Sequence, residues 1–154
     1  HAKAIELARN LARQKPERKD IEERDILQLH AVMLAGIDDA HAGRYRSVPV
    51  RVAGSQALFP NPMKIPELMA EFFMWLHQGN NDHPVTIAVD AHFKLVSIHP
   101  FVDGNGRVAR LLMNLLLMQA GYPPVIIKPE QRLVYIQALE KAQTKEMLDD
   151  YYRN

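Results

Sequence analysis

"HPFVDGNGRVARLLMNLLLMQ", residues 99–119, joins a polar, glycine-rich loop directly to a strongly apolar segment. From about Asn105 to Gln119 the apolar residues fall on nearly every side of a helix, and Gly121 before two prolines marks its end. A helix that is apolar nearly all round belongs in the middle of a bundle, where other helices cover it. This stretch therefore predicts an all-α fold built around one central helix.

The segments on both sides of this stretch repeat their apolar residues with helical spacing. Pro84 can occupy the first turn of a helix that runs to about Ile98 and delivers the chain to His99. Asp20 followed by Glu23 resembles a capping box at the start of another helix. Further helices are predicted around residues 5–12, 21–35, 65–78 and 133–139.

One segment, residues 45–62, breaks the helical pattern. Valines alternate with other residues over positions 48–52, and the turn-like residues 53–56 precede a short apolar run and two prolines. Pro49 restricts the first arm to an edge or irregular strand. The pattern predicts one small β-hairpin in an otherwise helical chain, although an ordinary covering loop is equally compatible with these residues alone.

The bulk composition indicates a single domain, residues 1–154, without nucleic-acid or membrane partners. Lys and Arg number 19 against 18 Asp and Glu, so the formal charge of +1 gives no general attraction for nucleic acid. No apolar run reaches the roughly 18 residues of a membrane span, and the absence of cysteine excludes disulfides and thiolate metal sites. The chain starts without Met and already in a helical pattern, which predicts that it is the core of a longer protein.

The loop before the central helix has the composition of a polyphosphate site. Gly104, Asn105 and Gly106 can turn their backbone N–H groups toward one anion, which the N-terminus of the helix also attracts. Arg107 and Arg110 are three positions apart, so they share one helix face and can bind further phosphates. Together these groups predict a di- or triphosphate ligand.

Two neighbouring side chains complete the predicted chemistry. Asp103 would repel a phosphate unless a divalent cation lay between them, and Mg²⁺ binds in this way through one carboxylate and phosphate oxygens. His99, with an ordinary pKa of about 6.5, is suited to take a proton from an attacking hydroxyl. Each feature alone is compatible with a turn or a solvated helix face. On a helix that is apolar on its other sides, their combination favours a functional site.

Two other interpretations of this stretch are disfavoured. Residues 104–109 match the G-x-G-x-x-A pattern of dinucleotide-binding folds, but that pattern requires a strand immediately before it. A metal-hydrolase site built on His92, His99 and Asp103 lacks a close histidine pair and a third firm ligand. The phosphate interpretation is therefore retained.

Residues 99–110 match the signature of the Fic (filamentation-induced-by-cAMP) family, His-Pro-Phe-x-Asp/Glu-Gly-Asn-Gly-Arg-x-x-Arg, at all nine fixed positions. The preceding helix, the hairpin and the run "LLMNLLLMQAGYPPVII" also resemble the FICD-like branch, which has metazoan endoplasmic-reticulum members and bacterial relatives. The resemblance covers essentially the whole chain. It implies a Fic-type helical bundle that transfers AMP from ATP to a Ser, Thr or Tyr hydroxyl of a target protein. We favour a bacterial, cytoplasmic location.

The family's motif implies a role for each matching residue. Carried over by motif position, His99 would act as the base, and Asp103 would hold Mg²⁺ against the α- and β-phosphates. The remaining motif residues would bind the phosphates of ATP: Gly104, Asn105 and Gly106 as the anion hole, Arg107 on a phosphate, and Arg110 on the γ-phosphate.

Outside the motif, the resemblance implies a target-binding segment and an adenine contact. Residues 46–59 would be the flap that docks the target protein by strand addition. Tyr135 and Gln143 fall where related enzymes contact adenine, and a core or surface role is equally compatible with each. The resemblance also leaves room for a homodimer.

Many Fic proteins carry an inhibitory helix with the pattern Ser/Thr-x-x-x-Glu-Gly/Asn, and no such pattern occurs in residues 1–154. The helix would lie upstream of residue 1, be supplied by a partner, or be absent, and we favour the upstream position. This chain by itself is therefore predicted to be free of self-inhibition.

Alternatives to AMP transfer stay open at this point. The same site could remove AMP from a target, or transfer phosphate or another nucleotide-derived group. The phosphate-transferring branch, however, has lysine where this chain keeps Gly106. A nucleotide-binding interaction module without catalysis is a further alternative, against which the intact His99 argues.

Overall fold

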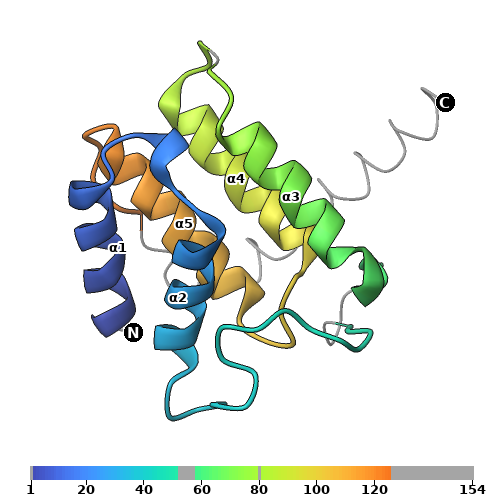
Figure 1. Cartoon of the computed structure of the whole chain (residues 1–154). Helices are drawn as coiled ribbons and strands as arrows, with labels where there is room; N and C mark the ends of the chain where they lie inside the picture. Colours follow the sequence, from blue (N-terminus) through green and yellow to red (C-terminus); the bar gives the residue numbers. More distant parts are fainter. Residues whose placement is uncertain (1, 52–57, 80, 126–154) are drawn as a thin grey trace, which may run out of the picture.

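The computed structural model describes residues 2–51, 58–79 and 81–125, which form helices joined by loops (Figure 1). The predicted all-α class is confirmed for these residues, and the last two helices have the predicted bounds. None of the described helices has the length and apolarity needed to cross a membrane. In chain order the elements are α1 (Ala2–Gln14), the 3₁₀ turn η1 (Arg18–Asp20), α2 (Glu23–Leu34), the 3₁₀ turn η2 (Pro62–Lys64), α3 (Ile65–Leu76), α4 (Pro84–Ile98) and α5 (Asn105–Gln119).

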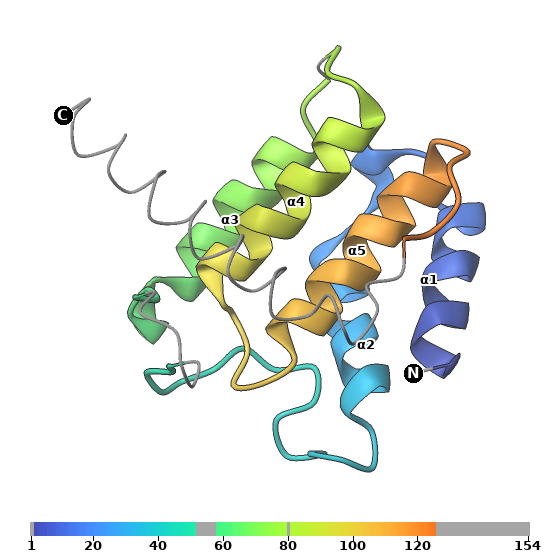
Figure 2. The ribbon, with the colours of Figure 1, turned by 180° about the vertical axis from the view of Figure 1, so that it is seen from behind.

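Helix α5 occupies the centre of the bundle, as its apolar surface predicts (Figure 1, and from behind in Figure 2). It forms an antiparallel pair with α4 and packs against α1 and α2 on its other side, while α3 lies along α4. The buried α5 side chains include Val108, Ala109, Leu112, Leu115, Leu116 and Leu117. Because both α4 and α5 are anchored in this core, the loop that joins them is held at both ends.

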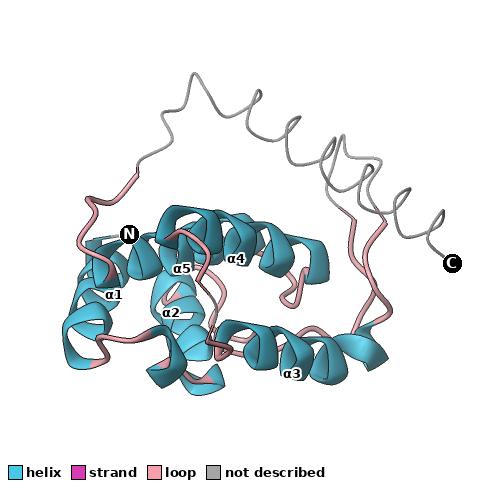
Figure 3. Ribbon diagram, turned by 90° about the horizontal axis from the view of Figure 1, so that it is seen from above, coloured by secondary structure: helices cyan, strands magenta, loops and turns pink. Residues whose placement is uncertain are grey.

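The segment between α2 and α3 does not contain the predicted strands in its described part, and Figure 3 shows it as loop. The Arg46 side chain donates to the carbonyls of Val48 and Pro60, 3.1 and 2.6 Å away, so a guanidinium connects the two arms. Pro49 also has no N–H to offer a β-ladder. Of the flap predicted over 46–59, the described residues are therefore irregular loop. Residues 52–57, which hold the predicted turn, lie outside the described residues.

The start of α2 differs from the predicted capping box. Asp20 belongs to the preceding 3₁₀ turn, and the box is formed by Glu22 and Asp25. The Glu22 N–H donates to Asp25 Oδ2 at 2.8 Å, and the same oxygen accepts from Lys15 Nζ at 2.6 Å. A contact from the end of α1 thus selects which acidic residue caps α2.

Candidate active site

The loop of residues 99–104 connects α4 to α5 through a left-handed residue at each end. His99 closes α4 with φ 54° and ψ 58°, and its N–H donates to the Leu95 carbonyl at 3.0 Å. Gly104 opens α5 with φ 81°, and its carbonyl accepts from the Val108 N–H at 2.9 Å. These two conformations turn the chain sharply, which keeps His99 and the first turn of α5 within one short loop.

The Asn105 side chain closes this loop from inside. Its Oδ1 accepts from the Phe101 N–H and its Nδ2 donates to the Phe101 carbonyl, both at 2.9 Å, and the residue is buried. This amide therefore faces the protein, so that only the backbone N–H of Asn105 is available for the predicted anion hole. The assignment of that N–H to an anion stays a prediction.

His30, on α2, holds the middle of the loop. Its ring stacks on Phe101 with 3.7 Å between centroids and 8° between planes. Its Nδ1 accepts from the Gly43 N–H at 3.0 Å, so the ring proton resides on Nε2, which donates to the Asp103 carbonyl at 2.9 Å. Burial lowers the pKa of His30. A neutral imidazole of defined tautomer therefore positions the backbone beside the Asp103 carboxylate.

The His99 imidazole is arranged as a proton acceptor. Its Nδ1 lies 3.1 Å from the Val96 carbonyl, which can only accept, so the proton is on Nδ1 and Nε2 carries the lone pair. The Phe59 ring stacks on it with 3.8 Å between centroids. Burial, aided by the positive charge of Arg46, lowers the pKa of His99, while the Val96 bond and Asp103 act in the opposite direction. The ring is therefore neutral at pH 7.

The Asp103 carboxylate is open to solvent next to the first turn of α5. Its Oδ1 accepts from the Gly104 N–H at 2.8 Å, and its Oδ2 lies 3.5 Å from Arg107 Nη2. The side chain is 65% exposed, which leaves lone pairs for a cation. The described residues contain no cluster of three or more acidic, histidine or cysteine side chains that could hold a metal. A single exposed carboxylate is suited to Mg²⁺ that is also coordinated by phosphate oxygens of a ligand, and not to a metal ion coordinated by protein side chains alone.

The two motif arginines lie over the glycines at the start of α5. A Cβ added at Gly104 would lie 3.7 Å from Arg107 Nη2, and one added at Gly106 would lie 3.5 Å from Arg110 Nη1. Both arginines are half-buried, and the charge of Arg110 also reaches His92. Glycine N-caps leave first-turn N–H groups without side-chain partners, and two guanidinium groups flank them here. This end of α5 therefore presents backbone and guanidinium donors for an anion beside the Asp103 carboxylate.

The sequence model of the Fic/DOC family matches residues 20–117, which contain the entire loop just described. The chain belongs to the Fic/DOC family. It is 49% identical over 125 residues to the protein adenylyltransferase Fic of Drosophila melanogaster, covering 80% of this chain and 25% of that protein. The protein of the same name from Drosophila grimshawi is 48% identical over 128 residues, covering 82% and 26%. The chain thus spans about a quarter of the length of these curated Fic relatives.

Solved Fic structures share the fold. Fic-1 from C. elegans superposes with a TM-score of 0.77 at 34% identity, covering 91% of this chain and 42% of that chain. A Fic domain containing signaling protein from Bacteroides thetaiotaomicron gives a TM-score of 0.75 at 31% identity, covering 89% and 54%. The resemblance predicted from residues 99–110 is therefore confirmed at the level of the family.

Sequence reasoning missed three side chains that the structure places against the Fic loop, namely His30, Arg46 and Phe59. His30 occupies a buried position in the helix predicted for 21–35, where a histidine among apolar residues is the available signal. Arg46 and Phe59 lie in the segment predicted as a hairpin, whose pattern did not indicate contacts with His99. The predicted adenine contacts Tyr135 and Gln143, with the helix around 133–139, lie outside the described residues.

Proposed function

We propose that this Fic/DOC chain transfers AMP from ATP to a Ser, Thr or Tyr hydroxyl of a target protein. The observation that carries the proposal is a neutral, Nδ1-protonated His99 in the loop whose other end supplies an open carboxylate and two arginines. The relatives named protein adenylyltransferase Fic support the same activity. Because the matched part of this chain covers only about a quarter of each relative, the activity, substrates and partners of the whole protein belong to this proposal.

His99 acts as the general base in the proposed reaction. Its Nε2 takes the proton of the target hydroxyl, the hydroxyl oxygen forms a bond to the α-phosphorus, and the bond from that phosphorus to pyrophosphate breaks. A lowered pKa keeps the imidazole unprotonated at neutral pH, which leaves it ready to accept this proton. The buried loop contacts keep the ring in one orientation, and such positioning supplies much of the rate of a phosphoryl-type transfer.

The other motif residues neutralise the charge of the triphosphate. Asp103 would hold Mg²⁺, which when bound stabilises negative charge on the α- and β-phosphates. The backbone N–H groups of Asn105 and Gly106 then contact phosphate oxygens, and that of Gly104 does so after leaving its 2.8 Å bond to Asp103 Oδ1. Arg107 leaves its 3.5 Å contact with Asp103 to bind a phosphate, and Arg110 binds the γ-phosphate.

Docking of the target along the flap, residues 46–59, by strand addition stays a prediction, and it requires an extended edge that the described residues of this loop do not form by themselves. A cavity of about 400 Å³ lined by Pro49, Val50, Arg51, Leu58 and Phe59 lies at its base and supports docking of an apolar target side chain there. Phe59 connects this cavity to the His99 ring. Four further expectations stay predictions: a homodimer, an inhibitory helix upstream of residue 1 or in a partner, a bacterial cytoplasmic location, and the adenine contacts of Tyr135 and Gln143.

The proposal is tested by replacing the base. The His99→Ala variant, incubated with Mg²⁺, lysate proteins and ATP labelled on the α- or the γ-phosphate, is expected to lose α-label transfer by about 100-fold or more. It keeps ATP binding, since the imidazole does not hold the phosphates. His41→Ala serves as the matched control, because His41 is exposed and its side chain, in the described part of the chain, contacts Asp38. Transfer of γ-label instead would indicate phosphate transfer, and wild-type chain that binds ATP but transfers neither label would establish a binding module.

A further inference from the structure

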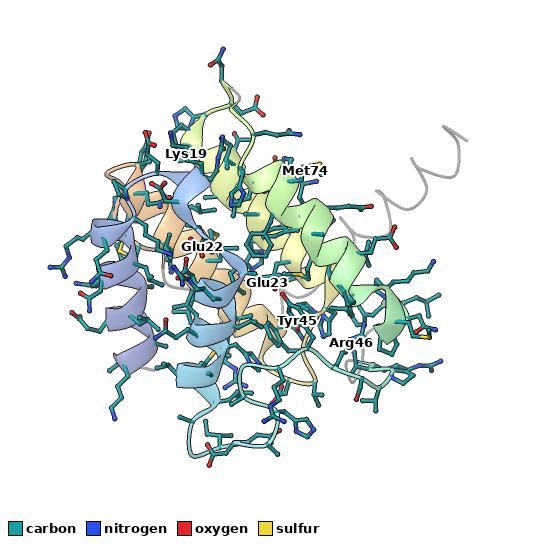
Figure 4. The ribbon with its side chains drawn as sticks, in the orientation of Figure 1. Lys19, Glu22, Glu23, Tyr45, Arg46 and Met74 are labelled. Carbon is teal, nitrogen blue, oxygen red and sulfur yellow. The ribbon has the colours of Figure 1, made fainter. Side chains whose placement is uncertain are left out.

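Arg46 is a buried arginine whose hydrogen bonds within the described residues all go to backbone carbonyls, and Figure 4 shows it on the loop between α2 and α3. Its Nε donates to the His99 carbonyl at 2.6 Å, and its own backbone N–H donates to the Pro100 carbonyl at 2.8 Å. The two Nη atoms donate to the carbonyls of Val48 and Pro60. One residue therefore binds the first turn of the Fic loop and both arms of the flap.

This arrangement is unusual for a buried charge. A buried guanidinium is normally compensated by a carboxylate, yet within residues 2–51, 58–79 and 81–125 Arg46 forms no ion pair. Its planar fork instead matches carbonyls from three separate places in the chain. A lysine ammonium, which is a point charge on a flexible stem, does not reproduce this geometry.

The bonds to His99 and Pro100 stabilise a turn that the chain disfavours. His99 is the non-glycine residue with positive φ in the described part of the chain. Its carbonyl follows the end of α4, where no helical N–H remains to donate to it. Arg46 satisfies this carbonyl and the next one. It thereby holds the backbone in the conformation that directs the imidazole.

The bond to Pro60 controls the other side of the same ring. Pro60 follows Phe59, whose ring covers the His99 imidazole. A shift of the Pro60 carbonyl therefore displaces the aromatic ring that packs on the base.

We infer that Arg46 is a positioning residue of the proposed transfer reaction, which couples the base of the flap to the orientation of His99. The inference rests on the proposed function only for its kinetic consequence. The placement of the His99 ring is a separate, directly measurable consequence. Among the described residues, the charge of Asp103, from the opposite end of the loop, also acts on this ring.

The kinetic test compares Arg46→Lys and Arg46→Gln with Arg44→Gln, which removes an exposed arginine two residues upstream. Both Arg46 variants are expected to lower kcat for AMP transfer by about 10- to 100-fold, the loss that a small misplacement of a reacting group causes. The KM for ATP changes less than about threefold, because the phosphate-binding residues are untouched, and Arg44→Gln behaves as wild type. Full activity in Arg46→Lys would overturn the inference, since charge alone would then suffice.

The structural test uses NMR and does not require transfer. In the wild-type chain the Arg46 Nε–H is expected to resist exchange with solvent and to show a cross-peak to His99, which tests the bond without any variant. In Arg46→Gln the His99 ring signals shift, and the pKa of the imidazole rises as a positive neighbour is lost, whereas Arg44→Gln leaves both unchanged. A rapidly exchanging Nε–H, or unchanged His99 signals in a folded Arg46→Gln, would overturn the inference even where wild-type transfer is absent.

Discussion

Gly104 meets two structural requirements at the start of α5. Its φ of 81° disfavours any residue with a Cβ by roughly 1–2 kcal/mol, and an added Cβ would lie 2.6 Å from Met33 Cε. Gly104→Ala is therefore expected to lower the free energy of unfolding by about 2 kcal/mol. Gly106→Ala is the matched control, because its nearest neighbour is Arg110 Nη1 at 3.5 Å, and it should change stability by less than about 0.5 kcal/mol. Equal effects in urea denaturation would contradict this account.

Asn105 illustrates how one buried amide defines the loop. In Asn105→Asp the carboxylate still accepts from the Phe101 N–H but cannot donate to the Phe101 carbonyl. Loss of about 2–3 kcal/mol of stability relative to the wild type is expected at pH 7, and this deficit should shrink in acid as the carboxyl regains a proton. Asn114 forms an equivalent pair of hydrogen bonds with the Val125 backbone at a more exposed place. In Asn114→Asp, thermal denaturation should therefore show a smaller loss of stability than in Asn105→Asp. A larger loss at Asn114 would refute the dependence on burial.

At the scale of elements, the start of α2 depends on a side chain from outside the helix. Asp25 caps the first turn and pairs with Lys15 at 2.6 Å, and its side chain is 6% exposed. Asp25→Ala removes the cap and leaves the Lys15 ammonium without its partner, which should cost about 3 kcal/mol of unfolding free energy. Glu17→Gln, which breaks the exposed pair with Lys19, should cost less than about 0.5 kcal/mol. Chemical denaturation followed by circular dichroism distinguishes the two, and comparable losses would argue against the role of the cap.

At the scale of the molecule, burial of neutral histidines makes stability depend on pH. Burial, with a smaller contribution from Arg110, lowers the pKa of His92 to about 4, whereas an unfolded histidine has a pKa of about 6.5. Between these values the unfolded chain binds more protons, so this contribution is complete above pH 6.5 and is lost as pH falls toward 4. From pH 7 to 5 the His92 contribution alone should fall by about 2 kcal/mol. His30 and His99, whose pKa values are also lowered, act in the same direction.

Urea denaturation at pH 7 and pH 5 measures this dependence. In His92→Gln the difference between the two pH values should shrink, because the buried imidazole is removed. A pH dependence in His92→Gln as steep as that of the wild type would contradict the assignment.

Local signals account for the parts of the fold that were predicted correctly. Pro84 and His99 mark the two ends of α4, and the apolar run from Asn105 to Gln119 marks the extent of α5. These start and stop signals are next to the helices in the sequence, so they can be recognised without knowledge of distant contacts. The predicted motif residues also lie together for this reason, since a loop and one helical turn bring them close without any distant contact. The predicted capping box at Asp20 was wrong, since Asp20 belongs to the 3₁₀ turn and the Glu22 N–H donates to Asp25, which also pairs with Lys15 just after α1.

The sequence by itself determined the helical class, the central helix and the composition of the Fic motif, because periodicity and local spacing are properties of neighbouring residues. Only the tertiary structure decided what surrounds His99. Arg46, 53 positions away in the sequence, donates to the backbone carbonyl of His99. The ring of Phe59 stacks on the His99 imidazole. His30, 73 positions from Asp103, hydrogen-bonds to the Asp103 carbonyl. Such contacts follow from how the helices pack. A buried guanidinium or imidazole acquires its role from the carbonyls that the folded chain brings to it.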